Sequence, residues 1–78
     1  FLGGGASEEV LQAIWDRVTP GTRLGANAVA LETQALLIRW HGMHGGQLLR
    51  IDLAQAAPLG TMQGWHPSRP QLQWSVTR

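Results

Sequence analysis

A connection rich in proline and glycine, residues 57–70, carries the side chains best suited to bind an acidic ligand. It contains Trp65, His66 and Arg69. The planar guanidinium of arginine binds a carboxylate through two parallel hydrogen bonds, and an aromatic ring offers a flat apolar face. We therefore expect these three side chains to contact a substrate. The alternative is an ordinary surface loop, with Trp65 packed beneath it and Arg69 in water.

Three consecutive glycines, Gly3, Gly4 and Gly5, form a second candidate site. They let a ligand approach the backbone closely, and they precede a predicted helix whose first N–H groups favour an anionic group. The alternative is a tight turn that needs positive φ angles. A dinucleotide-binding fingerprint is excluded, because Glu8 stands where that motif requires its third glycine.

Two further polar residues lie where a strand leads into a helix. Asn27 is the strongly polar residue of a strand that is otherwise apolar on both faces. A buried, unpaired amide costs about 1–3 kcal/mol, so Asn27 needs a partner, either a substrate or neighbouring backbone. Glu32 falls in the first turn of the next predicted helix. The helix dipole accounts for a carboxylate there, and a role toward substrate is the alternative.

Metal and nucleophile chemistry finds little support in the sequence. His41 and His44 are three residues apart and His66 offers a third imidazole, but no cysteine or nearby carboxylate completes a ligand set. We expect no metal site. Ser7 is better explained as a helix cap than as a nucleophile.

The composition narrows the class of protein. The chain has 78 residues, with six arginines as its only basic residues apart from histidine, five acids and no cysteine. One surplus charge makes no nucleic-acid-sized basic patch, and the apolar stretches are too short to span a membrane. A core of this size without disulfides is marginal.

Alternation and capping signals then give the elements that position these residues. Phe1 and Leu2 are expected to end a strand severed from a larger sheet, and Ser7 to begin a helix that ends before Pro20. The later predicted elements are a strand over residues 22–30, a helix over 31–44, a strand over 47–56 and a last strand over 71–77. Trp15, Trp40 and Trp74 fall on apolar faces and are expected in the core or at an oligomer contact.

Alternating strands and helices predict an α/β layer, and two final strands without a helix between them predict an antiparallel edge pair. Ligands of open α/β sheets bind outside the carboxyl ends of the parallel strands. Three segments should reach that edge: residues 3–7, 29–33 and 57–70. No repeat or low-complexity tract is present.

Several strings in this order resemble a known family. They are Phe1-Leu-Gly-Gly-Gly-Ala-Ser7, Pro20-Gly-Thr-Arg-Leu-Gly-Ala-Asn-Ala-Val-Ala-Leu-Glu-Thr33, His44-Gly-Gly46, Gly64-Trp-His-Pro67 and Gln73-Trp74. Together they are similar to the decarboxylating precorrin-6Y methyltransferases of cobalamin biosynthesis, in their C-terminal class I (Rossmann-like) methyltransferase domain. Thr22 and Gly25 depart from the usual residues of that family, in ways that bear on strand stability rather than chemistry.

The resemblance implies an S-adenosylmethionine-dependent enzyme that methylates a precorrin at C-15 and decarboxylates an acetate side chain. The chain would be the carboxyl half of the domain, unable to bind the cofactor without the missing N-terminal half. Gly3, Gly4 and Gly5 would border the cofactor. Five residues would contact the tetrapyrrole substrate: Asn27, Glu32, Trp65, His66 and Arg69. We also expect a cytoplasmic homo-oligomer that binds neither nucleic acid nor membrane.

Two alternatives remain open from the sequence. One keeps the class I methyltransferase fold and changes the substrate to another small molecule. The other is a small α/β interaction module that dimerises through its edge strands, for which the alternating face of Leu72, Trp74 and Val76 is the motive.

Overall fold

The computed structural model describes residues 6–78, so the predicted strand end at Phe1 and Leu2 and the three glycines lie outside the described residues. The described part contains two helices and five strands. They are α1 (Glu8–Arg17), β1 (Arg23–Ala28), α2 (Leu31–His44), β2 (Gln47–Ile51), β3 (Ala54–Leu59), β4 (Met62–Pro67) and β5 (Gln71–Thr77).

Helix α1 begins where the sequence predicts. The Ser7 hydroxyl accepts a hydrogen bond from the Val10 N–H at 3.3 Å, and two glutamates occupy the first turn, where the helix dipole favours negative charge. The Glu8 carboxylate also accepts hydrogen bonds from the Arg39 guanidinium and, at 3.2 Å, from the Trp40 indole Nε1. This residue therefore joins the start of α1 to α2.

Strand β5 is the middle strand of a three-stranded sheet in the order β1-β5-β2. Both neighbours run antiparallel to it, so β1 and β2 are parallel to each other. The expected antiparallel pair of late strands is present as β2 and β5. The last strand is not the outer member of that pair, because it inserts between the two earlier strands.

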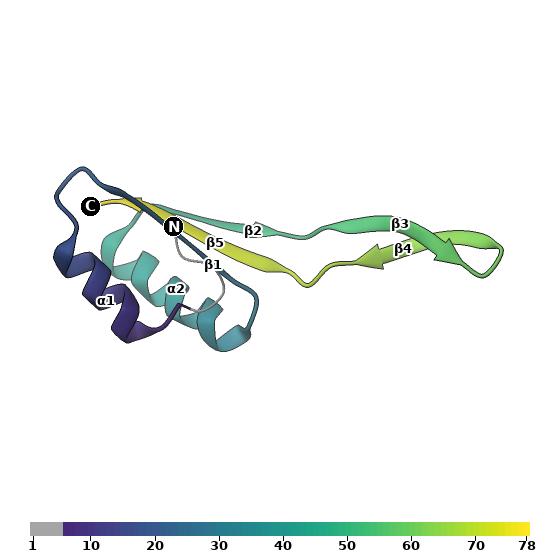
Figure 1. Cartoon of the computed structure of the whole chain (residues 1–78), viewed down its shortest axis with the longest axis horizontal. Coiled ribbons are helices and arrows are strands. Elements are labelled where there is room, and N and C mark those ends of the chain that lie inside the picture. Colours follow the sequence, from purple (N-terminus) through teal and green to yellow (C-terminus); the bar gives the residue numbers. More distant parts are fainter. Residues whose placement is uncertain (1–5) are drawn as a thin grey trace.

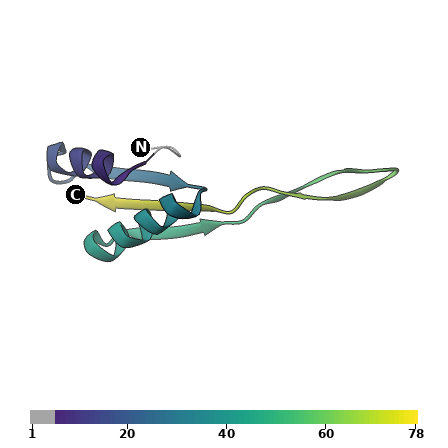
Figure 2. The ribbon, with the colours of Figure 1, turned by 90° about the horizontal axis from the view of Figure 1, so that it is seen from below.

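Both helices cover the same face of this sheet (Figures 1 and 2). The core between them is built on Leu37, Trp40 and Trp74, each at most 1% exposed, over the small side chains of Ala26 and Ala28. The small residues let α2 approach the sheet closely, and replacing either tryptophan by alanine would cost about 3–5 kcal/mol. Of the three tryptophans expected on apolar faces, Trp40 and Trp74 are in the core, and the partly buried Trp15 packs against it.

The face of β5 that carries Leu72, Trp74 and Val76 belongs to this core, with exposures of 8%, 1% and 6%. The alternative interaction module, which dimerises through its edge strands, takes this face as its motive. That motive does not hold, because the helices already cover those side chains.

Residues 57–70 do not form the loop that the sequence predicts. The strand expected over residues 47–56 breaks after Ile51, and β3 and β4 then pair as an antiparallel hairpin from Ala54↔Pro67 to Leu59↔Met62. Gly60, at φ +61°, begins the two-residue turn. The hairpin projects away from the sheet and gives the molecule extents of 55 × 21 × 18 Å (Figure 1).

The prolines of this segment explain the wrong prediction. Proline lacks an N–H and normally argues against a central strand. In a two-stranded hairpin each strand has one unpaired edge, where a missing donor costs nothing. Pro58 and Pro67 therefore fit in β3 and β4.

Candidate functional site

The parallel strands β1 and β2 end at the same side of the sheet, and α2 begins and the hairpin departs from that side (Figure 2). We call this the carboxyl edge. It comprises residues 29–32 after β1, 52–53 after β2 and 68–70 before β5. Its position follows from the topology, because β5 runs antiparallel and therefore starts where its neighbours end. This is the place where open α/β sheets bind ligands.

Gln34, a half-buried residue of α2, connects the parts of this edge. Its Nε2 lies 3.4 Å from the Ala28 carbonyl oxygen, 3.2 Å from that of Val29 and 3.3 Å from that of Pro70. The first acceptor belongs to the last residue of β1, the second to the residue after it, and the third directly precedes β5. One amide group thus holds the strand that leads into α2 against the segment that leads out of the hairpin.

Asn27 is next to this edge, on the sheet face that points away from the helices. Along β1, Leu24, Ala26 and Ala28 face the helices, so Asn27 points the other way, beside Gln73 in the strand register. Its Oδ1 is buried and has no hydrogen-bond partner among residues 6–78. An orphaned acceptor of this kind calls for a donor from a ligand or from another part of the protein.

Arg69 lies at the base of the hairpin, in an open hollow of about 560 Å³ that Asp52, Leu53 and Ser68 also line. Its side chain is exposed, as is that of Glu32 in the first turn of α2. The Ser68 N–H donates to the Leu53 carbonyl oxygen at 2.8 Å and closes the hairpin base. Arg69 and Glu32 therefore belong to the same edge as Asn27.

Trp65 and His66 are placed differently, because both lie on β4 rather than in a loop. They are successive strand residues, so their side chains point to opposite faces of the hairpin. Trp65 is 77% exposed, so the alternative in which it packs beneath a loop does not hold. The structure thus separates this pair from Arg69 by part of a strand.

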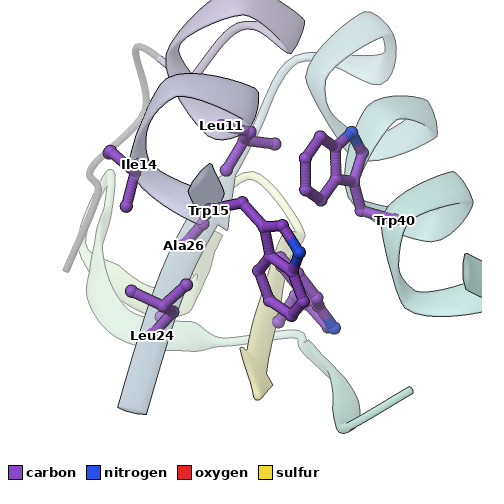
Figure 3. A pocket seen from close by; sticks show the side chains of 8 residues that line it. Leu11, Ile14, Trp15, Leu24, Ala26 and Trp40 are labelled. Atoms are coloured by element: carbon purple, nitrogen blue, oxygen red, sulfur yellow. The ribbon is translucent and has the colours of Figure 1, made fainter. Parts of the chain in front are cut away.

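An apolar cavity of about 70 Å³ lies between the helices and the sheet, with Trp15 and Trp40 in its wall (Figure 3). Leu11 and Ile14 from α1 and Leu24 from β1 also line it. The cavity is far too small for a cofactor or a macrocycle. It is a packing defect of the core rather than a substrate site.

His44, near the end of α2, takes part in packing. The His44 ring lies with its centroid 4.1 Å from that of Trp15 and 4.9 Å from that of Trp40. Within residues 6–78 no three histidine, aspartate or glutamate side chains gather as they would around a metal ion. Neither described helix combines the length and hydropathy needed to cross a bilayer.

A family model described as a precorrin methyltransferase domain matches residues 1–78, the whole chain. The chain belongs to this family. Among the curated relatives of this precorrin methyltransferase domain are two precorrin-6Y C(5,15)-methyltransferases [decarboxylating]. One, from Sinorhizobium sp., is 47% identical over 79 residues, and the other, from Mycobacterium tuberculosis strain H37Rv, is 42% identical over 79 residues. The domain aligned here spans about a fifth of each relative's length, 19% and 20%.

A solved structure gives the same assignment for the fold. The crystal structure of the C-terminal domain of precorrin-6Y C5,15-methyltransferase from Rhodobacter capsulatus is 59% identical and superposes with a TM-score of 0.92. The alignment covers 96% of this chain and 41% of that one. The family resemblance and the mixed α/β fold class expected from the sequence are both confirmed.

Sequence reasoning missed Gln34, although it found its neighbours Asn27 and Glu32. The acceptors of Gln34 are backbone carbonyls, and one of them is 36 residues away. Side-chain spacing carries no signal for such a bond. The hairpin, in contrast, did have a signal in the sequence, because Leu59-Gly60-Thr61-Met62 has the form of a two-residue turn.

Proposed function

We propose that this chain is part of an S-adenosylmethionine-dependent methyltransferase that methylates a precorrin at C-15 and decarboxylates an acetate side chain in cobalamin biosynthesis. The observation that carries the proposal is the match of the whole chain to relatives that bear that name, at 47% and 42% identity. The α/β topology, with an open carboxyl edge, supports it independently of the names.

The cofactor is proposed to bind mainly to residues outside the described part of the chain. Gly3, Gly4 and Gly5 are proposed to border S-adenosylmethionine, which supplies an electrophilic methyl group when bound. We assign none of the described side chains to it. The chain is proposed to be the carboxyl half of its domain, and it should not bind the cofactor without the other half.

The substrate is assigned to the carboxyl edge. A precorrin carries several acetate and propionate carboxylates on a flat macrocycle. The exposed guanidinium of Arg69 can take one carboxylate bidentately, and the unpaired Oδ1 of Asn27 can accept a hydrogen bond from a macrocycle N–H. Glu32 is proposed as a neighbour of the same ligand.

Trp65 and His66 are proposed as contacts to the periphery of the substrate. The Trp65 ring is large, flat and exposed, which suits it to stack on an aromatic or conjugated surface. β4 leads directly to residues 68–70, so both residues follow the Arg69 hollow along the hairpin, one on each of its faces.

The chemistry then depends on orientation more than on an acid–base pair. Holding a nucleophilic carbon in line with a methyl donor lowers the barrier by several kcal/mol, since the entropy of alignment is lost on binding. Loss of CO₂ leaves an electron pair that the conjugated macrocycle accepts. A carboxyl edge that excludes water would assist both steps.

We also propose that the protein is a homo-oligomer joined through the β3–β4 hairpin. Residues 54–67 contain no lysine, arginine, aspartate or glutamate, and the tip exposes Leu59 at 68% and Met62 at 74%. A two-stranded hairpin is marginally stable in water by itself. A second copy of the hairpin would cover the tip and pair with its bare edges.

The experiment that tests the function uses the full-length protein, precorrin-6Y and S-adenosylmethionine, with products weighed by mass spectrometry. We expect each product molecule to have gained methyl groups and lost one CO₂. Methylation without loss of CO₂ would favour a class I enzyme with another reaction. No conversion of precorrin-6Y, with turnover of another small molecule, would favour the alternative substrate.

A further inference from the structure

We propose that Gln34 is a positioning residue that clamps the carboxyl edge and so sets the place of Arg69 relative to the β1–α2 junction. For its effect on substrate this inference rests on the proposed function. The clamp itself rests on the three backbone contacts of one side-chain amide.

The hydrogen-bond ladder between β1 and β5 stops before the hairpin base. Pairing between β1 and β5 ends at Ala28↔Leu72. Beyond that pair, Pro70 has no N–H to offer, so the ladder cannot continue through it. Past this point the Gln34 amide donates to the carbonyl oxygens of Val29 and Pro70, at 3.2 and 3.3 Å, so a side chain joins the two segments where the backbone ladder has ended.

The two carbonyl groups belong to segments that carry candidate substrate contacts. Pro70 follows Arg69 directly, and Val29 leads into the turn that carries Glu32. Fixing both carbonyls to one side chain fixes the two segments to each other. Gln34 itself is held by α2, whose next turn contains the buried Leu37. The clamp is therefore anchored in the core.

The side chain at position 34 has to be a hydrogen-bond donor. Its acceptors are all carbonyl oxygens, so only a donor serves at this position. Methionine has nearly the same length and no donor, whereas glutamate would place a negative charge among three oxygens. Gln34→Met should therefore release the clamp, and Gln34→Glu should repel it.

Hydrogen exchange on the full-length protein tests the clamp without any activity measurement. In Gln34→Met we expect backbone amides of residues 68–72 to exchange about tenfold faster than in the wild type, the change that loss of one or two ordinary hydrogen bonds gives. Gln12→Met is the matched control, since among residues 6–78 the Gln12 amide bonds only to Asp16, within α1, at 3.0 Å. Exchange at residues 68–72 that is unchanged in Gln34→Met would overturn the proposal.

Kinetics with precorrin-6Y test the effect on substrate. Gln34→Met should raise KM about five- to tenfold and change kcat less than about twofold, because a displaced Arg69 weakens ground-state binding. In an Arg69→Ala background the same substitution should raise KM no further, since its route to the substrate is already gone. If the increases in KM from the two substitutions multiply in the double variant, Gln34 does not act through Arg69 and its role in positioning Arg69 is overturned.

The exchange and kinetic experiments test the clamp and the proposed function separately. A wild-type enzyme that leaves precorrin-6Y unchanged overturns the proposed function, and the exchange result alone then decides the clamp. Faster exchange in Gln34→Met with an unchanged KM would overturn the link to substrate.

Discussion

Asn27 is an unusual residue because half of its amide group is buried without a partner in the described chain. Folding does not favour such an acceptor by itself, since the lost hydrogen bond to water is not replaced. Gly25, two residues earlier on the same face of β1, adds no side chain beside the amide. We propose that its partner comes from outside residues 6–78 and is the substrate.

Replacing Asn27 by leucine distinguishes a substrate contact from a structural one. We expect the free energy of unfolding of Asn27→Leu to change by less than about 1 kcal/mol, because no donor in this part of the chain is left unpaired. KM for precorrin-6Y should rise about tenfold, measured by steady-state kinetics. Asn27→Asp keeps an acceptor oxygen at this position and should raise KM less than Asn27→Leu does. A clear loss of stability with an unchanged KM would contradict the assignment.

At the scale of elements, most of the fold was predictable from local signals. Ser7 marked the start of α1, Gly45 and Gly46 the end of α2, and the alternation of Leu72, Trp74 and Val76 marked β5. These signals act over a few residues and depend little on the rest of the chain. The candidate residues on regular elements, Asn27 and Glu32, were accordingly placed correctly along the chain.

The parts that were not predictable depend on distant segments. Whether the last strand lies inside or outside its sheet depends on the pairing with β1, which no local pattern encodes. The hairpin has alternation too weak to outweigh its prolines and glycines. For that reason Trp65 and His66 were expected in a loop beside Arg69 and lie instead on β4.

The helix-to-strand turn after α2 gives a prediction about stability. Gly46 has φ +89°, and a Cβ there would collide with the Ser75 carbonyl oxygen and the Val76 side chain. Gly46→Ala should therefore lower the free energy of unfolding by about 2 kcal/mol or more, measured by denaturant unfolding of the full-length protein.

Gly42→Ala is the matched control for that turn. Gly42 lies within α2, and a Cβ there meets nothing within 4 Å. Alanine should raise the free energy of unfolding by about 0.5–1 kcal/mol, because it is the better helix former. Equal effects of the two substitutions would show that the backbone angle and the collision at Gly46 are unimportant.

At the scale of the whole molecule, the hairpin is the feature that a monomer explains least. It carries large exposed side chains at its tip, far from the helical layer, and no formal charge to keep them apart. Exposed apolar surface of this kind marks contact sites in soluble proteins. The oligomer proposed above would account for it.

Sedimentation of the full-length protein tests this assembly. We expect the wild type to sediment as an oligomer at micromolar concentration and the double variant Leu59→Glu/Met62→Glu to sediment as a smaller species, because four or more like charges would meet at the joined tips. Gln63→Glu, on the same hairpin, adds charge without removing apolar area and should weaken assembly less. A monomeric wild type would refute the proposal.

The position of β5 has a consequence for synthesis on the ribosome. Of the strands described, β5 is made last, yet it forms the middle of its sheet. Until it emerges, β1 and β2 have no partner between them, and Trp40 lacks one of the two indoles that pack against it, that of Trp74 at 6.2 Å. Pairing between segments so distant along the chain is slow. Nascent chains that stall before Gln71 would therefore display two bare strands and an uncovered helix, and would be natural clients for chaperones.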